Sequence, residues 1–268
     1  MTSSVSYGLK SDQLRPYSDL TIEGDRRMEA AHLDQLIQLE DSYWWHVAKR
    51  NWATNLLTRY APPPSRIIEG GIGAGGNLLH WKQMGYQVAG LDCMDESVEH
   101  ASKQGLTNVH LHDLHQPWPV EPASAEAIVL LDVLEHLKHP VLALRNAANC
   151  LTETGKIVFT VPAYPFLYSD WDERLGHFRR YTSSTLKQHA KEAGLKVLEL
   201  SHWNSFTLPI ACVVRLLRKV FPSRAGTEFP NVSPWINRTL IRCAETERSI
   251  AKTLNIPVGL SLVGVLER

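Results

Sequence analysis

Apolar and polar positions follow two different periods along the middle of the chain, and the periods predict strands and helices in turn. Short apolar runs predict strands at residues 66–69, 86–91, 108–111, 127–131 and 156–161. Helical patterns separate these runs. Because alternating strands and helices are typical of βαβ units, we predict an α/β fold with a parallel sheet covered by helices on both faces.

The segments on either side of this core predict further helices. Residues 1–25 are polar and aperiodic, which indicates a loose N-terminal arm. We predict a single domain over 26–268, made of a helical cover (26–61), a core (66–201), a helical cap (203–256) and a closing strand (259–268). The core would end with a sixth strand at 196–201.

One helix of the predicted cap is amphipathic. Its apolar positions form one face, made of Phe206, Ile210, Val213, Val214, Leu217, Val220 and Phe221. Arg215, Arg218 and Lys219 lie on another face. We interpret the apolar face as the side that docks on the core. Contact with a membrane surface, or with an apolar acceptor molecule, is the alternative.

Charge and cysteine content limit the choice of partners and compartment. The chain has 28 basic and 28 acidic residues, so no electrostatic footprint indicates nucleic acid. Its four cysteines show no CxxC spacing, which favours reduced thiols. The first ten residues lack the pattern of a signal peptide, and no apolar run is long enough to span a bilayer. We therefore expect a cytoplasmic protein; the sequence does not indicate its oligomeric state.

A glycine-rich turn follows the first strand and precedes a short helix. Gly71, Gly73 and Gly75 allow a tight turn and let a ligand touch the backbone. The turn also satisfies the dinucleotide pattern through Gly76. Glu69 favours another ligand, because a carboxylate would repel a pyrophosphate but attract the sulfonium and ammonium of S-adenosylmethionine (SAM).

Asp92 follows the second strand, 21 residues past Gly71. A carboxylate there can accept hydrogen bonds from two ribose hydroxyls. Since SAM and NAD both contain an adenosine, this position identifies the nucleoside and not the chemistry.

The motifs resemble those of class I SAM-dependent methyltransferases, in the family that includes the ubiquinone-biosynthesis O-methyltransferases. The resemblance is carried by the acid and glycines of 69–75, by Asp92, by Asp132-Val-Leu-Glu-His-Leu137 and by Gly176-His-Phe-Arg-Arg-Tyr-Thr182. It covers residues 66–201 and the last strand. Glu69 departs from the usual Asp.

This resemblance implies a three-layer, Rossmann-like sheet of seven strands, with the last strand antiparallel and inserted beside the fifth. It implies SAM as cofactor and S-adenosylhomocysteine as product. Asp113, after the third strand, would meet the adenine amino group, and Leu131, at the end of the fourth, would also contact the cofactor.

Residues 162–181 follow the fifth strand and are rich in aromatic and charged side chains. Ligands bind at the carboxyl ends of parallel strands, so we expect this loop to form the acceptor pocket through Tyr168, Arg179, Arg180 and Tyr181. One arginine could bind an anionic group of the acceptor. The other would pair with an acid of the loop: Asp170, Asp172 or Glu173.

Two histidines are candidates for the base that a hydroxyl acceptor requires. His177 and, after it, His136 fall at the same edge of the sheet. A structural histidine is the alternative for each.

A metal site is also conceivable, because Asp132, Glu135 and His136 would share one helical face. In the ubiquinone O-methyltransferases a Glu-x-x-Glu-His version resembles a divalent-metal site. We favour polar contacts at the start of a helix and predict no metal.

We predict that the enzyme moves a methyl group from SAM to a small or medium organic acceptor, at oxygen. The alternatives are a nicotinamide-dependent oxidoreductase and a noncatalytic SAM-binding subunit.

Overall fold

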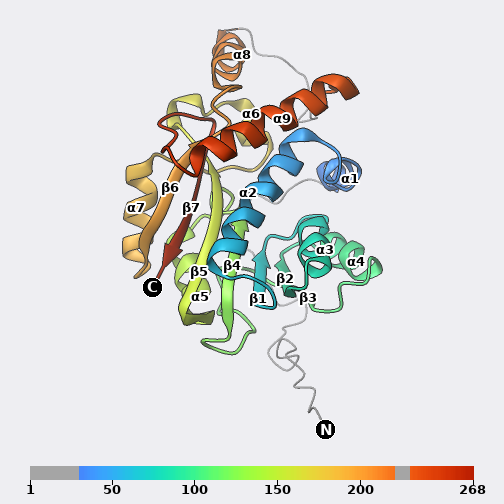
Figure 1. Cartoon of the computed structure of the whole chain (residues 1–268), viewed down its shortest axis with the longest axis vertical. Helices are drawn as coiled ribbons and strands as arrows, with labels where there is room; N and C mark the ends of the chain where they lie inside the picture. The colour runs from blue at the N-terminus through green and yellow to red at the C-terminus, as the bar shows by residue number, and fades with distance from the viewer. Residues whose placement is uncertain (1–29, 221–229) are drawn as a thin grey trace.

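The computed structural model describes residues 30–220 and 230–268. In this part of the chain seven strands form one sheet with the order β3-β2-β1-β4-β5-β7-β6 (Figure 1). The strands are β1 Arg66–Gly70, β2 Gln87–Asp92, β3 Val109–Leu111, β4 Ala125–Leu131, β5 Leu151–Pro162, β6 Lys196–Trp203 and β7 Ser261–Glu267. The predicted arm at 1–25 lies outside the described residues.

The direction of the strands confirms the predicted fold class. Strands β1 to β5 pair in parallel, and β7 pairs antiparallel with both β5 and β6. The strand order reverses between β1 and β4. The chain adds β2 and β3 on one side of β1, and it then continues with β4 on the opposite side of β1. Such a reversal opens a crevice at the carboxyl ends of the two strands.

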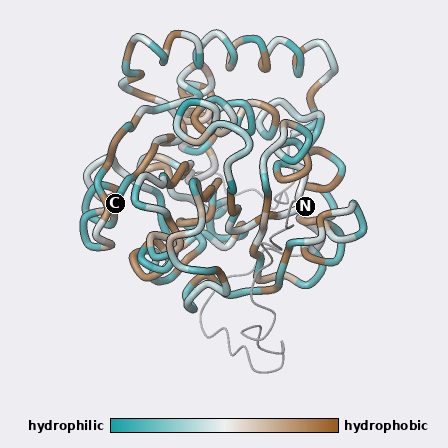
Figure 2. Tube along the Cα trace, turned by 60° about the horizontal axis from the view of Figure 1, so that its bottom comes forward, coloured by the Kyte–Doolittle hydropathy of each residue, from teal (hydrophilic) through white to brown (hydrophobic). Residues whose placement is uncertain are grey.

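Helices cover both faces of the sheet. They are α1 Ala30–Leu39, α2 Trp44–Tyr60, α3 Gly76–Gln83, α4 Asp95–Lys103, α5 Pro140–Cys150, α6 Asp170–Arg174, α7 Ser183–Glu192, α8 Leu208–Val220 and α9 Pro234–Ala251. Alternate residues of β4 serve the two faces: Val129 packs with α2, α3 and α4, whereas Leu130 packs with α5 and α7. Figure 2 shows the apolar positions running through the middle of the molecule.

Two local features differ from the predictions. The fifth strand starts before the predicted run at 156–161, because β5 begins at Leu151 and its pairing with β4 is irregular there. A Cβ at Gly155 would lie 2.9 Å from the carbonyl oxygen of Ala125, so glycine permits this close pairing. The loop at 162–181 also contains a short 3-10 helix, η3 (Pro165–Leu167), and α6, which a capping box of Ser169 and Asp172 begins.

The apolar face of α8 does not dock on the core as we expected. Ile210 is 69% exposed and Leu217 is 54% exposed, and Val213 and Val214 are exposed as well. The polar side of the helix faces the protein instead, because Arg215 forms an ion pair with the fully buried Asp172. The side chains of Arg218, Lys219 and Val220, together with Phe221, lie outside what the structure describes. No helix within the described ranges is long and apolar enough to cross a membrane.

Candidate active site

A cavity of about 510 Å³ opens at the carboxyl ends of β1, β2 and β4, beside the point where the strand order reverses. Its walls come from the glycine turn, from the residues after β4, from the loop after β5, and from α2 and α8. The volume is within the range of small-molecule sites.

The glycine turn forms one end of the cavity, and its backbone explains the residue choice. Gly71, Gly73 and Gly75 have φ angles of 76°, 55° and 87°, in the left-handed region that side chains rarely adopt. A Cβ at Gly73 would lie 2.8 Å from Cδ2 of Leu36. Gly75 precedes α3 and packs against Ala101, so it shapes the turn without lining the cavity.

Buried carboxyl groups surround this end. One oxygen of Glu69 accepts a hydrogen bond from Asn77 at 2.9 Å, and the other is buried without a partner among the described residues. Asp92 accepts hydrogen bonds from the backbone N–H groups of Gly73 and Met94 at 3.0 and 2.9 Å. Burial raises the pKa of Glu69 to about 8 and that of Asp92 to about 6.

Two further acids line the same end. Glu40 accepts a hydrogen bond from the backbone N–H of Gly76 at 3.1 Å, at the start of α3, and burial raises its pKa to about 7. Asp113 accepts two hydrogen bonds from His115, both at 2.9 Å. Although burial acts in the opposite direction, these contacts hold the pKa of Asp113 below its usual value. This end of the cavity is therefore suited to a cationic ligand.

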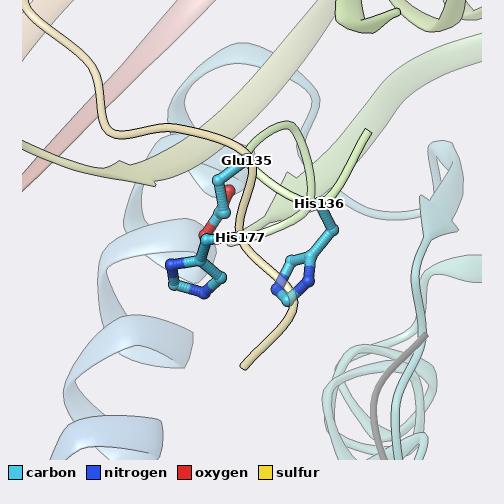
Figure 3. Close-up of side chains that lie close together, drawn as sticks. All are labelled: Glu135, His136 and His177. Atoms are coloured by element: carbon cyan, nitrogen blue, oxygen red, sulfur yellow. The ribbon is translucent and has the colours of Figure 1, made fainter. Parts of the chain in front are cut away.

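His177, His136 and Glu135 meet at the other end of the cavity (Figure 3). The two imidazole rings are 4.6 Å apart in an edge-to-face arrangement. Both carboxyl oxygens of Glu135 are buried without a partner among the described residues. Burial and the nearby charge of Asp132 raise the pKa of Glu135 well above its usual value. The three side chains offer ligand atoms within 4.8 Å of one another, so they could relay a proton or hold a divalent cation.

Asp172 fixes the loop that carries His177. Its fully buried carboxylate accepts hydrogen bonds from Nδ1 of His177 at 3.0 Å, Nε of Arg180 at 2.8 Å and Nη1 of Arg215 at 2.7 Å. Burial opposes ionisation, but these three partners hold the pKa of Asp172 well below its usual range. The expectation that one arginine pairs with an acid of this loop is confirmed for Arg180.

Asp132 lies between the two ends of the cavity and has a strained backbone, with a φ of 55°. Nζ of Lys49, from α2, lies 2.9 Å from one carboxylate oxygen, and the hydroxyl of Thr160 donates to the other at 2.7 Å. Burial opposes ionisation, but Lys49 and Thr160 keep the pKa of Asp132 below its usual value. Because its carboxylate binds Lys49 and Thr160, Asp132 is not part of the possible metal-binding group formed by Glu135, His136 and His177.

Comparison with known proteins identifies the family. A family model described as a methyltransferase domain matches residues 44–200, more than half of the chain. The chain belongs to the methyltransferase-domain family. S-adenosylmethionine is the cofactor of this methyltransferase, and the group of buried acids at the glycine turn suits its positive charges.

Individual relatives are distant. The methyltransferase is 31% identical over 97 residues to a ubiquinone biosynthesis O-methyltransferase of Idiomarina loihiensis, covering 33% of this chain and 40% of that protein. The corresponding protein of Xanthomonas campestris is 26% identical over 109 residues, with 38% and 45% covered. The chain spans less than half the length of these curated relatives.

A solved structure supports the same fold. It is the complex of the Haloferax volcanii Trm112 methyltransferase activator and a methyltransferase, and it matches with a TM-score of 0.60 at 20% identity, covering 88% of this chain and 94% of that one. At this identity the likeness concerns the fold.

Most of the residues predicted for the site line this one cavity. They are Glu69, Gly71, Gly73, Asp92, Asp113, Leu131, His136, His177 and Arg180. Three residues predicted for the acceptor pocket do not. Tyr181 is fully buried, and its hydroxyl donates a hydrogen bond to the backbone carbonyl of Leu134. The hydroxyl of Tyr168 donates a hydrogen bond to the backbone carbonyl of His177. Arg179 donates to the carbonyl of Lys138 outside the cavity.

Sequence reasoning missed three charged residues of the methyltransferase cavity. Glu40 and Lys49 come from helices that precede the glycine turn, and Arg215 comes from α8. Lys49 lies 83 positions before Asp132, and Arg215 lies 43 positions after Asp172, so no spacing in the sequence joins these pairs. The one available signal was the placing of Arg215 on the polar face of α8.

Proposed function

We propose that the methyltransferase transfers a methyl group from SAM to an oxygen atom of a small or medium organic acceptor, and that His177 removes the acceptor proton. The observation that carries this proposal is the position of His177: its ring lines the cavity while its Nδ1 is held by the carboxylate of Asp172. The chain matches less than half the length of its curated relatives. The proposed acceptor class therefore rests on the geometry of this cavity.

The cofactor would lie along the glycine turn. Glu69 and Glu40 would face the charged methionine part of SAM, Asp92 the ribose hydroxyls and Asp113 the adenine, with Leu131 contacting it from the end of β4. Methyl transfer from a sulfonium is an in-line displacement, so the protein has to align the two reactants and exclude water. The acceptor would then enter between Asp132 and the loop that carries His177.

A carboxylate next to one imidazole nitrogen selects a tautomer. Asp172 favours the proton on Nδ1 of His177, which leaves Nε2 as the basic atom. An acceptor hydroxyl within hydrogen-bond reach of Nε2 could give up its proton as the methyl group arrives. His136, whose ring lies against that of His177, is the second candidate for this role.

The reaction as proposed requires no metal ion, because the positive sulfonium already activates the methyl group. We propose that it takes place in the cytoplasm with all four cysteines reduced. All four cysteines lie in the described part of the chain and form no disulfide bond there, and Cys150 is buried.

The test is a screen of hydroxylated aromatics, sugars and lipid precursors for formation of S-adenosylhomocysteine. Mass spectrometry and NMR of the product would locate the new methyl group. A methyl ether supports the proposal. Methylation of nitrogen or carbon by the best acceptor would contradict the assignment to oxygen and leave the methyltransferase reaction standing.

A further inference from the structure

A surface pocket of about 440 Å³ lies beside the loops that follow β4 and β5. Its walls come from the residues just before α5, from the first turns of α5, from the loop after β5 and from α7. It shares no lining residue with the cavity that holds His177. Its volume is within the range of small-molecule sites, so we asked which ligand its side chains favour.

Three of the side chains that line the surface pocket are cationic, and none is acidic. Lys138 follows the residues after β4, Arg145 lies in α5, and Arg179 lies in the loop after β5. None of the three forms an ion pair with another described residue. Three segments of the chain thus bring positive charge to one place, which attracts an anion.

These cations also keep hydrogen-bond donors for a ligand. Nη2 of Arg145 donates to the backbone carbonyl of Glu192 at 2.8 Å, and Nη2 of Arg179 donates to that of Lys138 at 3.0 Å. Within residues 30–220 and 230–268, the two guanidinium groups form no other hydrogen bond, and Nζ of Lys138 forms none. Since a guanidinium has five N–H donors and an ammonium three, each side chain can still donate to an anion.

Glu192, at the end of α7, is an acid near this group, but it does not line the surface pocket. It contacts Arg145 through its backbone, and its carboxylate accepts a hydrogen bond from Gln188 at 2.9 Å. Burial and the positive charge of Arg179 lower the pKa of His189, against the smaller opposing effect of Glu192. At this wall the charge of Arg179 therefore outweighs that of Glu192.

The start of α5 adds to the positive field. Pro140, Val141 and Leu142 form the first turn of the helix and line the surface pocket. The N-cap residue, His139, makes no side-chain capping hydrogen bond. The positive end of the helix dipole is therefore not masked by a cap and acts together with the three cations.

We propose that the surface pocket binds the phosphate group of a small phosphate ester. A phosphate group carries up to two negative charges and three acceptor oxygens, which match the donors that Lys138, Arg145 and Arg179 supply from three segments of the chain. The organic part of the ester lies against Val141 and Leu142. This binding site is separate from the site of methyl transfer, and the inference does not depend on the identity of the methyl acceptor.

The ester comes from solution. Leu142 is 40% exposed, and it is the sole exposed large apolar side chain among the residues that line the surface pocket. One such side chain does not form the broad apolar face with which a protein enters a lipid surface.

The bound phosphate connects the two loops that carry the candidate catalytic histidines. Lys138 lies two positions after His136, and Arg179 lies two positions after His177. The loops already meet here, because Arg179 donates to the carbonyl of Lys138. A ligand held by both side chains adds a second link and restricts the movement of both loops.

The binding test uses glycerol 3-phosphate as the probe and glycerol as its uncharged match. Calorimetry is done at constant ionic strength on the full chain saturated with S-adenosylhomocysteine. We expect glycerol 3-phosphate to bind at least about tenfold more tightly than glycerol.

Variants assign this binding to the surface pocket. Lys138→Gln and Arg145→Gln should each weaken the binding of glycerol 3-phosphate by about 5- to 20-fold, because each removes a charged donor. Arg145→Lys keeps the charge and should retain part of the affinity. The control is Arg238→Gln, which changes an exposed arginine of α9 outside both the surface pocket and the cavity and should bind as the wild type does. Thermal melts show that each variant is folded.

Hydrogen–deuterium exchange tests the link between the loops. Glycerol 3-phosphate should slow amide exchange at residues 133–139 and 176–181 of the wild type by about twofold or more. At the same concentration it should have a smaller effect on Arg145→Gln. Unchanged exchange in a wild-type protein that has bound the ester would contradict the link.

Equal affinity for glycerol and glycerol 3-phosphate would overturn the phosphate site, as would wild-type affinity in folded Lys138→Gln and Arg145→Gln proteins. Sedimentation with phosphatidic acid vesicles distinguishes a lipid headgroup from a dissolved ester. A protein that sediments with these vesicles through Arg145, but does not bind glycerol 3-phosphate, would contradict the dissolved ligand.

Discussion

Nδ1 of His177 lies 3.0 Å from Oδ1 of Asp172, and the same oxygen accepts the Nε hydrogen of Arg180 at 2.8 Å. One buried carboxylate therefore orients the candidate base and also ties it to two arginines. This relationship makes the stability of the loop and the chemistry of the site depend on the same residue.

Replacing Asp172 by Asn should lower the free energy of unfolding by about 3–5 kcal/mol at neutral pH, because both arginines lose their buried partner. A carboxyl whose pKa falls on folding stabilises the protein above its unfolded pKa, and the effect is lost as pH falls through the folded pKa. The folded pKa of Asp172 lies well below 3.8, so the difference should persist down to about pH 4. Urea unfolding at several pH values measures it; Asp170→Asn, on the partly exposed neighbour, is the control.

The affinity for SAM should rise with pH between about 6 and 8. The pKa values of Asp92, Glu40 and Glu69 are raised to about 6, 7 and 8, so these groups are protonated in the free protein at low pH. The cation favours their ionised forms. Each proton released on binding should therefore raise the affinity by about tenfold per pH unit below the pKa.

The free protein should behave in the opposite way. A carboxyl whose pKa rises on folding costs stability above its unfolded pKa, so the melting temperature without ligand should fall as pH increases toward 8.

Calorimetry in two buffers of different ionisation enthalpy counts the protons released when SAM binds. Glu69→Gln should remove the part of the pH dependence of SAM affinity that lies near pH 8. An affinity that stays constant from pH 5.5 to 8.5 would show that these acids do not receive the cofactor charge.

Gly73→Val should abolish SAM binding, because it places a side chain at a φ of 55° on the cavity wall. Gly105→Val is matched in backbone strain, with a φ of 91°, but it lies away from the cavity and should cost stability only. Asp92→Ala should weaken SAM binding by about 1–3 kcal/mol through lost hydrogen bonds. Calorimetry with SAM and NAD checks all three variants. Micromolar binding of NAD without SAM binding would contradict the cofactor assignment.

Chelation of divalent metal should leave turnover unchanged. Asp132 is neutralised by Lys49, and the proposed transfer relies on the sulfonium and on a protein base. Elemental analysis of the purified protein, followed by assays with and without EDTA, tests this. One bound metal ion per chain, together with activity that is lost on chelation and restored by the metal, would assign Glu135, His136 and His177 as ligands instead.

The local pattern of the sequence was sufficient for the sheet and for most of the glycine-turn end of the cavity, where it missed Glu40. Glu69 and Asp92 lie at the ends of β1 and β2, and Gly73 lies in the turn that follows β1, so the order of elements alone fixes their place. Successive residues of β4 point to opposite faces of the sheet, so their positions in the strand predict which face each side chain packs on.

The end of the cavity that holds His177 could not be predicted in the same way, because long-range ion pairs determine its structure. The sequence suggests that the apolar face of α8 turns inward, yet the pairing of Arg215 with the buried Asp172 turns the polar face inward. Arg179 and Arg180 are adjacent in sequence, but consecutive side chains point in different directions, and only Arg180 reaches the cavity. No periodicity encodes a contact between residues 43 positions apart.

The turnover of His177→Ala with the true acceptor tests the account most directly, with His110→Ala, a change of a partly exposed histidine in β3, as the matched control. Single-turnover rates are measured from pH 5.5 to 9 at saturating SAM. We predict that His177→Ala keeps its affinity for SAM and loses about 10²–10⁴-fold in rate, while His110→Ala behaves as the wild type. A His177→Ala enzyme that methylates the acceptor at the wild-type rate across this range would contradict the account and make His136 the next residue to test.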